Sequence, residues 1–147
     1  KIAARIVRIF NTYGPRMRAE DGRVISNFIT QAINKKPLTI QGDGSQTRSF
    51  CYVSDLVEGI YRAMNTPNTK GEVFNLGNPD EHKVIDLAEK IQNLLGSKKE
   101  FEYKSLPLDD PQKRRPDISK AKKMLGWEPK IKLPEGLKKS IEYYQKN

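Results

Sequence analysis

The sequence is poor in cysteine and histidine, with one residue of each among its 147 residues. The single thiol, Cys51, rules out an internal disulfide and favours a reducing compartment. It stands between Phe50 and Tyr52 in an apolar stretch, so we expect a core residue rather than a reactive thiol. The single histidine, His82, follows a polar turn and is not expected to be catalytic. No His, Cys, Asp and Glu residues have the spacing of a metal site, so no metal is predicted.

Long hydrophobic runs are also missing, and no secretory signal pattern opens the sequence. We therefore predict no membrane contact from this chain and a cytoplasmic location. Residues 1–7 resemble the interior of a strand rather than the natural start of a chain. The absence of targeting signals therefore says little about a longer parent protein. A parent held in the Golgi lumen by an upstream anchor stays an open alternative.

Positive charge is abundant, with a formal net charge of +9. Lys and Arg exceed Asp and Glu in residues 1–50 and 98–147, whereas the segment between them is mildly acidic. No zinc-finger, RNP or helix-turn-helix pattern accompanies the basic residues. Arginines placed singly at turns fit a small anionic ligand better than a polyanion, so we predict no nucleic-acid partner. A basic RNA-binding domain is the competing interpretation.

Apolar patterning predicts strands that alternate with helices, which indicates an α/β fold. The expected strands cover residues 2–10 (a buried strand), 38–40, 49–53, 72–76 and 101–104. The expected helices cover residues 24–35, a stretch from Ser54 as N-cap with Leu56, Val57, Ile60 and Met64 on one face, residues 84–95, residues 119–125, and a stretch opened by Pro134. Gly42-Asp43-Gly44 predicts a turn, and Gly96 predicts a left-handed helix end.

Four sequence blocks occur in order and carry a resemblance. They are Arg8-Ile-Phe-Asn-Thr-Tyr-Gly-Pro15; Gly42-Asp-Gly-Ser-Gln-Thr-Arg-Ser-Phe50 with Tyr52-Val-Ser-Asp-Leu56; Phe74-Asn-Leu-Gly-Asn78; and Arg115-Pro-Asp117 with Leu125-Gly-Trp127 and Pro129. Together they resemble the extended short-chain dehydrogenase/reductase family over essentially all of the chain. Three further stretches are similar to the UDP-glucuronate decarboxylases (UDP-xylose synthases) of that family: Gly22-Arg-Val-Ile-Ser-Asn-Phe28, Ser45-Gln-Thr-Arg48 and Asp109-Asp-Pro-Gln-Lys-Arg-Arg-Pro-Asp117.

The resemblance implies that residues 1–147 are the C-terminal, substrate-binding portion of such an enzyme. The implied fold is the C-terminal part of an NAD-binding Rossmann-type fold plus a small α/β substrate-binding lobe, with residues 1–15 as a remaining Rossmann strand and turn. The family's G-x-x-G-x-x-G loop and catalytic Tyr-x-x-x-Lys pair do not occur in this sequence. We therefore expect both upstream, no catalytic residue here, and no activity from the chain alone. The implied partners are the N-terminal NAD-binding half and, at full length, a second copy in a homodimer.

The implied activity is the NAD-dependent conversion of UDP-glucuronate to UDP-xylose and CO2 through a 4-keto intermediate. Oxidation of C4 makes the C6 carboxylate part of a β-keto acid, and the ring ketone takes up the electrons as CO2 leaves. A UDP-sugar 4-epimerase and a nucleotide-sugar 4,6-dehydratase share the outer sequence pattern and stay alternatives. A non-catalytic nucleotide-sugar binding module is the alternative of another class.

The same resemblance assigns side chains to the ligands. The residues expected to bind the UDP-sugar are Asn11, Val24, Asn27, Thr39, Gln41, Arg48, Arg114 and Arg115. Those expected to contact NAD are Thr12 and Arg23. Arg48 is expected at the diphosphate because a planar guanidinium suits phosphate oxygens, and which of Arg114 and Arg115 faces the ligand stays open. Gln46 is expected to order its loop, Asp55 to serve as a helix-start carboxylate, and Tyr52 and Trp127 to pack.

Overall fold

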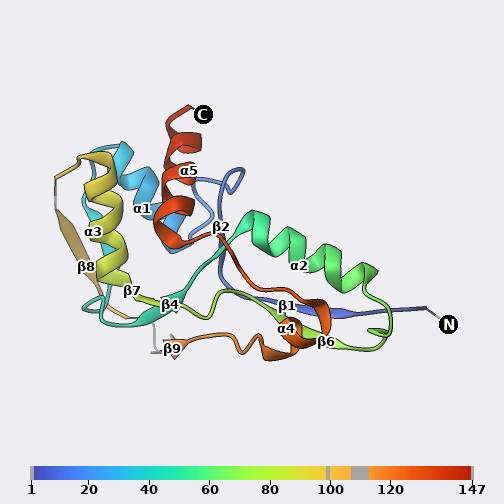
Figure 1. Ribbon diagram of the computed structural model, residues 1–147. Helices are drawn as coiled ribbons and strands as arrows, with labels where there is room; N and C mark the ends of the chain where they lie inside the picture. The colour runs from blue at the N-terminus through green and yellow to red at the C-terminus, as the bar shows by residue number, and fades with distance from the viewer. Residues whose placement is uncertain (1, 99, 107–112, 147) are drawn as a thin grey trace.

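The computed structural model describes residues 2–98, 100–106 and 113–146, in which strands and helices alternate as a mixed α/β fold (Figure 1). Residues 109–112, part of the motif that resembles the decarboxylases, lie outside the described residues. The strands are β1 (Ile6–Ile9), β2 (Thr12–Tyr13), β3 (Leu38–Gln41), β4 (Thr47–Ser49), β5 (Cys51–Tyr52), β6 (Val73–Leu76), β7 (Glu81–Lys83), β8 (Phe101–Lys104) and β9 (Lys113–Arg114). The helices are α1 (Val24–Ile33), α2 (Val53–Asn65), α3 (Val84–Leu95), α4 (Ser119–Leu125) and α5 (Leu133–Lys146).

One group of elements is built on β1 and β6, which pair in parallel and are covered by α2 and α4 (Figure 1). Phe74 and Leu76 of β6 and Trp127 form its core, and each is almost fully buried. Gly59 lets α2 lie close to β6 and Trp127, because a Cβ there would lie 2.9 Å from side-chain atoms of both Leu76 and Trp127. The small residue is therefore a packing requirement of this group.

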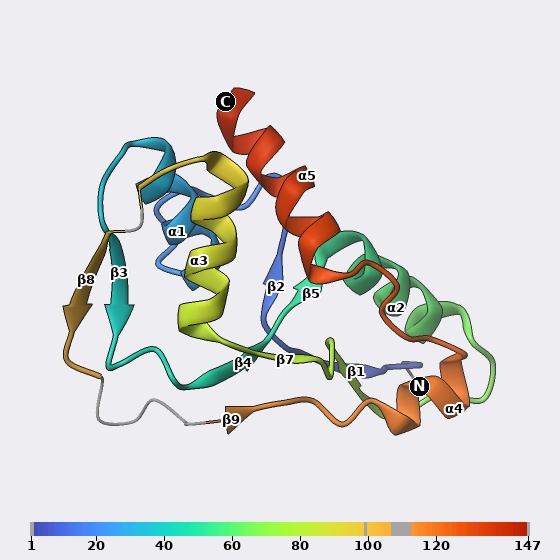
Figure 2. The same cartoon turned by 60° about the vertical axis from the view of Figure 1, so that its left-hand side comes forward.

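A second group contains β3 and β8, which also pair in parallel, with α1, α3 and α5 packed together beside them (Figure 2). Its core joins Phe28 and Ile29 of α1, Leu87 and Ile91 of α3, and Leu137 of α5, all nearly inaccessible to solvent. These residues recur at helical spacing, as the sequence predicts. The last helix begins at Leu133, which places Pro134 in its first turn.

Short strands connect the two groups. β2 pairs in parallel with β5, and β4 lies between β7 and β9 in a three-stranded sheet. β7 pairs antiparallel and β9 pairs parallel with β4. The sequence patterns do not predict β2, β7 or β9, because each is only two or three residues long and lacks an apolar alternation.

Several expectations about local structure are confirmed. Cys51 is fully buried, Gly96 ends α3 in the left-handed conformation with φ 62°, and residues 42–44 form a turn. Tyr52 and Trp127 pack in the core, and the Trp127 indole donates a hydrogen bond of 2.8 Å to the Asp55 carbonyl.

Other expectations are wrong. The strand expected over residues 2–10 covers only β1 and is not buried, since Ile6 and Ile9 are 58% and 53% exposed. β1 has one strand neighbour among the described residues, and the helices cover β6 more fully. Ser54 is not the N-cap of α2, because the helix starts at Val53 and Tyr52 takes the cap position without a side-chain bond.

The buried face of α2 also differs from the expected one. Val57 and Met64 are 58% and 66% exposed, whereas Leu56, Gly59 and Ala63 face the core. The small residues face inward because the helix lies close to β6 and Trp127, a requirement that apolar periodicity does not report. Helix α1 ends at Ile33, before the expected Lys35, which has a positive φ of 55°.

Candidate functional site

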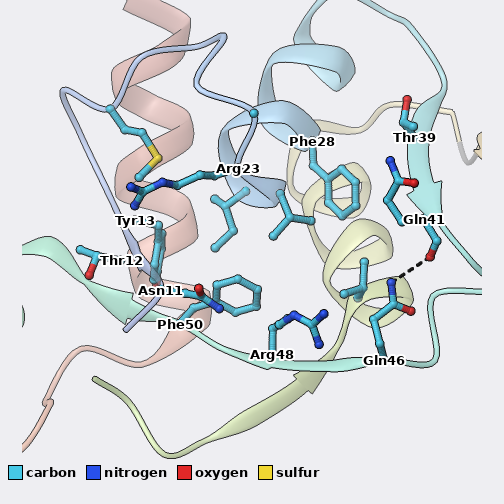
Figure 3. Close-up of a pocket in the computed structure, with 15 residues that line it drawn as sticks. Asn11, Thr12, Tyr13, Arg23, Phe28, Thr39, Gln41, Gln46, Arg48 and Phe50 are labelled. Atoms are coloured by element: carbon cyan, nitrogen blue, oxygen red, sulfur yellow. Dashed lines mark hydrogen bonds between the residues drawn. The ribbon is translucent and has the colours of Figure 1, made fainter. Parts of the chain in front are cut away.

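A cavity of roughly 390 Å³ lies where β2, the start of α1, β3 and β4 meet (Figure 3). This volume is in the range of small-molecule sites. Its lining residues are Asn11, Thr12, Tyr13, Met17, Gly22, Arg23, Val24, Ile25, Phe28, Thr39, Gln41, Gln46, Arg48, Phe50 and Val84. Seven of the ten residues assigned from the sequence are among them, and they come from four separate elements and the loop before α1.

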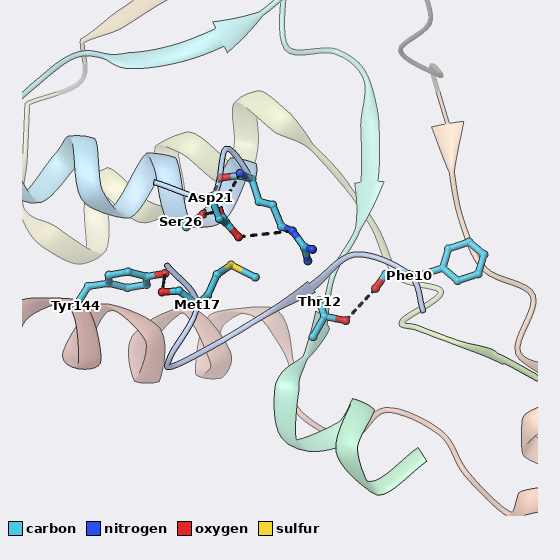
Figure 4. A network of polar contacts seen from close by, with 7 residues as sticks. Phe10, Thr12, Met17, Asp21, Ser26 and Tyr144 are labelled. Atoms are coloured by element: carbon cyan, nitrogen blue, oxygen red, sulfur yellow. Dashed lines mark hydrogen bonds and ion pairs between the residues drawn. The ribbon is translucent and has the colours of Figure 1, made fainter. Parts of the chain in front are cut away.

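The first wall of the cavity is held by the pairing of β2 with β5. The carbonyl of Asn11 accepts a hydrogen bond of 2.8 Å from the amide of Cys51. The hydroxyl of Thr12 donates to the carbonyl of Phe10 at 2.9 Å (Figure 4). Backbone bonds therefore fix the place of Asn11, and its half-buried side-chain amide lines the cavity.

The loop that precedes α1 is fastened at two points (Figure 4). The hydroxyl of Tyr144 on α5 donates to the carbonyl of Met17 at 2.9 Å, and burial raises the pKa of Tyr144, so the donor keeps its proton. The carboxylate of Asp21 accepts bonds from the Arg23 amide at 3.0 Å and from the Ser26 hydroxyl. Asp21 thereby ties this loop to the first turn of α1.

Arg23 lies at the rim of the cavity. Its guanidinium forms an ion pair of 3.5 Å with Asp21, and its side chain is 62% exposed. An exposed ion pair of this kind contributes little to stability. The guanidinium is accordingly available to turn toward an anionic ligand at the mouth of the cavity.

Arg48 is the most buried cation of the site, with an exposed fraction of 9%. It projects from β4 toward the other lining residues, and one of its terminal nitrogens donates to the Thr47 carbonyl at 2.7 Å (Figure 3). In the sheet its position pairs with His82 of β7 on one side and with Arg114 of β9 on the other. The central strand thus carries a buried guanidinium into the cavity.

His82 does not line the cavity, although it pairs with Arg48 in the sheet. Burial, and after it Lys90, lowers the pKa of His82. The lowered pKa favours the neutral imidazole near pH 7.

Aromatic and aliphatic side chains form an apolar wall. The rings of Tyr13 and Phe50 meet edge to face at 6.4 Å between centroids, and Phe28 faces the same cavity from α1 (Figure 3). Val24 and Ile25 add aliphatic surface. A planar apolar group can lie against such a wall.

Amide and hydroxyl groups form the far end, along β3. The side chain of Gln46 donates to the Gln41 carbonyl at 2.8 Å (Figure 3). The side chain of Gln31 on α1 bonds Thr39 twice, accepting from its amide at 3.1 Å and donating to its hydroxyl at 2.9 Å. Gln46 orders its loop, as expected from the sequence, and it also lines the cavity.

Three assigned residues do not line the cavity. Asn27 lies on α1, one turn after Arg23, and its backbone amide donates a hydrogen bond to the Arg23 carbonyl. Arg114 is exposed on β9 beside Arg48. Arg115 lines a separate concave surface with Pro79, Pro116, Asp117, Ile118, Ser119 and Lys122. The two neighbouring arginines therefore lie in different surroundings.

Asp55 has a structural role that extends beyond the start of α2. Its buried carboxylate accepts backbone bonds from Lys130 at 2.9 Å and Ile131 at 2.8 Å. It lies in the first turn of the helix, as expected. The same side chain thus fixes the segment that leads into α5.

The sequence did not single out several lining residues as ligand contacts: Tyr13, Met17, Gly22, Ile25, Phe28, Phe50 and Val84. Tyr13 and Phe50 stand within two positions of assigned residues, and Phe28 lies one helical turn after Val24, so proximity was a usable signal. Met17 has no such signal.

Within the described ranges, no cluster of His, Cys, Asp and Glu could hold a metal ion, and no helix has the length and apolar character to cross a membrane.

Residues 1–77 match the NAD dependent epimerase/dehydratase family. The chain is 53% identical over 145 residues to UDP-glucuronic acid decarboxylase 1 of Xenopus tropicalis, covering 99% of this chain and 34% of that protein. Its fold matches UDP-glucuronic acid 4-epimerase from Bacillus cereus, solved with UDP-glucuronic acid and NAD, with a TM-score of 0.92, 33% identity, and coverage of 99% of this chain and 46% of that one.

UDP-glucose 4-epimerase from Thermotoga maritima, solved with UDP-glucose, is also similar, with a TM-score of 0.91 and 36% identity over 97% of this chain and 46% of that one. The fold class expected from the sequence is confirmed by these matches. The chain spans about a third of the length of the curated decarboxylases that it matches.

Proposed function

The chain belongs to the NAD dependent epimerase/dehydratase family, and we propose that it is the UDP-sugar-binding portion of a UDP-glucuronate decarboxylase. The observation that carries the proposal is the buried guanidinium of Arg48 in a cavity with an apolar wall and an amide-lined end. A diphosphate needs the cation, and a planar base needs an apolar face to lie against and amide groups at its edge. The similarity to decarboxylases over nearly the whole chain supports the choice of reaction.

In this proposal the diphosphate is bound by Arg48, with Arg114 from the adjacent strand. Guanidinium groups bind phosphate oxygens in pairs of parallel hydrogen bonds. The paired sheet positions of the two residues support Arg114 over Arg115, which lies at a different surface. Asn11 contacts the sugar or a phosphate from the end of the first wall.

The uridine occupies the other half of the cavity, beside Val24, Thr39 and Gln41. Asn27 is included from the resemblance, on the same helix as Val24. Thr12 and Arg23 contact NAD in this proposal. Both line the cavity from the side of β2 and the following loop, and Arg23 has the exposed guanidinium that a pyrophosphate would need.

NAD, when bound, supplies a hydride acceptor for C4 of the sugar. The residues of this chain hold the UDP end, so that the sugar is presented at a constant place while its C4 hydroxyl becomes a ketone. The bond from C5 to the carboxylate then breaks, CO2 leaves, and the electron pair passes into the ketone. A proton at C5 and the returned hydride at C4 complete UDP-xylose.

The base that takes the C4 proton is not among the residues of this chain, because no Tyr-x-x-x-Lys occurs in it. We propose that this pair and the G-x-x-G-x-x-G loop belong to an NAD-binding half of the same enzyme, in which residues 1–15 continue the Rossmann sheet. The exposed Ile6 and Ile9 of β1 support such a neighbour. A homodimer of the whole enzyme and a cytoplasmic, reducing location complete the proposal.

Release of labelled CO2 tests the reaction. The enzyme that contains this chain, supplied with NAD and UDP-glucuronate labelled at C6, should release label as UDP-xylose forms. The chain alone under the same conditions should release none. Conversion to UDP-galacturonate with retention of the label would instead identify a 4-epimerase, the candidate favoured by the match to the Bacillus cereus enzyme.

A further inference from the structure

The edge of β3 that faces the cavity has a defined order of hydrogen-bonding groups. Leu38 and Gly42 donate their amides to β8, to the carbonyls of Glu100 at 2.9 Å and Lys104 at 2.8 Å. Because amide directions alternate along a strand, Thr39 and Gln41 turn their backbone groups to the opposite edge. That edge offers, in order, the Thr39 amide, the Thr39 carbonyl, the Gln41 amide and the Gln41 carbonyl.

Two glutamine side chains occupy the outer groups of this edge. Gln31 accepts from the Thr39 amide, and Gln46 donates to the Gln41 carbonyl. Within the described part of the chain, no protein hydrogen bond reaches the two groups between them, the Thr39 carbonyl and the Gln41 amide. One acceptor and one donor are therefore left to face the cavity.

Gln31 also fixes the polarity of the Thr39 hydroxyl. Its side-chain oxygen must face the Thr39 amide, so its NH2 group is the one that donates to the hydroxyl oxygen. The hydroxyl hydrogen cannot point back at that NH2 group, and it remains for an acceptor in the cavity. Thr39 and Gln41 together then present a donor, an acceptor and a donor along the wall.

We propose that Gln31 and Gln46 are positioning residues that set this order and so make the site select an imide base, such as uracil, over cytosine. The inference rests on the proposed function and deepens it. The edge of uracil carries an acceptor, a donor and an acceptor, which matches all three groups. In this arrangement uracil O4 meets the Thr39 hydroxyl and O2 meets the Gln41 amide. Cytosine places its N3 lone pair against the Thr39 carbonyl and its amino group, in place of O4, against the Thr39 hydroxyl hydrogen, and a site built for one hydrogen-bonding pattern rejects the other.

Amide exchange tests the arrangement without any ligand. In the parent chain the Thr39 amide should be protected and the Gln41 amide should exchange freely. In Gln31→Leu the protection of Thr39 should fall, while that of Leu38 is kept. Equal exchange rates of the Thr39 and Gln41 backbone amides in the parent chain would overturn the inference.

Calorimetric titration with UDP and CDP tests the selection. In Gln31→Glu the carboxylate still accepts the Thr39 amide but cannot donate to the hydroxyl, whose hydrogen turns toward it. We expect the preference for UDP over CDP to fall by about tenfold, because UDP loses a hydrogen bond to O4 that CDP does not make. Gln145→Glu on the exposed end of α5 adds the same charge and should leave the preference unchanged.

The possible results separate the inference from the proposed function. A lower preference in Gln31→Glu, with Gln145→Glu like the parent, supports the inference. UDP binding with an unchanged preference overturns the inference and leaves the proposed function standing. A chain with the expected exchange pattern that binds neither nucleotide contradicts the proposed binding role, and the selection of a base falls with it.

Discussion

Arg48 on β4 and Arg114 on β9 occupy directly paired positions of a parallel register. Paired residues of neighbouring strands extend from the same face of a sheet, so two arginines from distant parts of the chain share one face of this sheet. In the proposed function a diphosphate binds between these two side chains, so the register of this short sheet would contribute to the binding of ligand.

The pair of arginines is tested by substituting each one. Arg114→Ala should weaken UDP binding by about tenfold or more, since hydrogen bonds to charged groups contribute about 1.5–3 kcal/mol. Arg115→Ala is the matched control, because Arg115 lies on a separate concave surface, and it should bind UDP as the parent does. Calorimetry measures both affinities. The reverse order of effects would place Arg115 at the ligand.

The close approach of Tyr13 to α5 predicts that Gly136 cannot carry a side chain. A Cβ at Gly136 would contact the Tyr13 hydroxyl and lie 2.8 Å from the ring carbon that bears it. Gly136→Ala should lower the free energy of unfolding by about 1–3 kcal/mol, as overpacking does, despite the higher helix propensity of alanine. Chemical denaturation measures the change. Lys138→Ala on the exposed face of the same helix should be nearly neutral.

The two backbone bonds accepted by Asp55 predict a large effect of its removal. Asp55→Ala leaves the buried amides of Lys130 and Ile131 without their acceptor, and we expect a loss of about 2–4 kcal/mol of stability. Asp86 stands at the same place in the first turn of α3 but is exposed. Asp86→Ala should therefore cost about 0.5 kcal/mol, the helix-dipole contribution alone. Comparable losses in the two variants would contradict the assigned role of Asp55.

The buried thiol of Cys51 is expected to lower the free energy of unfolding at alkaline pH. Burial, with a smaller contribution from Asp55, raises the pKa of the Cys51 thiol from 9.0 to about 12. Between these pH values the unfolded chain releases the proton and the folded chain keeps it, so stability falls as the pH rises. Denaturation at pH 7 and pH 10 should show a smaller fall for Cys51→Ala than for the parent chain. Fast alkylation of the native thiol at pH 8 would contradict the burial.

Helical segments could be predicted from the sequence because their buried faces repeat at helical spacing. Phe28 and Ile29 in α1 and Leu137 in α5 are examples. The face of α2 could not be predicted this way, since Gly59 and Ala63 face inward for reasons of distance rather than hydrophobicity.

The site was predicted residue by residue from a resemblance, and the geometry adds what the sequence cannot contain. The local sequence pattern does not distinguish Arg114 from Arg115. The pairing of β9 with β4 does, because it places Arg114 opposite Arg48, whereas Arg115 lies at another concave surface. Gln31 and Thr39 likewise meet across a helix and a strand. Such contacts depend on the packing of α1 against β3, which no local propensity reports.

Titration of the folded chain with UDP-glucuronate, next to its Arg48→Ala variant, tests whether the buried guanidinium of Arg48 binds the diphosphate. Circular dichroism of both proteins first establishes that the variant is folded. We expect the parent chain to bind UDP-glucuronate and free UDP, and Arg48→Ala to lose at least about tenfold in affinity for both. Equal binding by the parent chain and a folded Arg48→Ala variant would contradict the claim that this buried arginine holds the diphosphate.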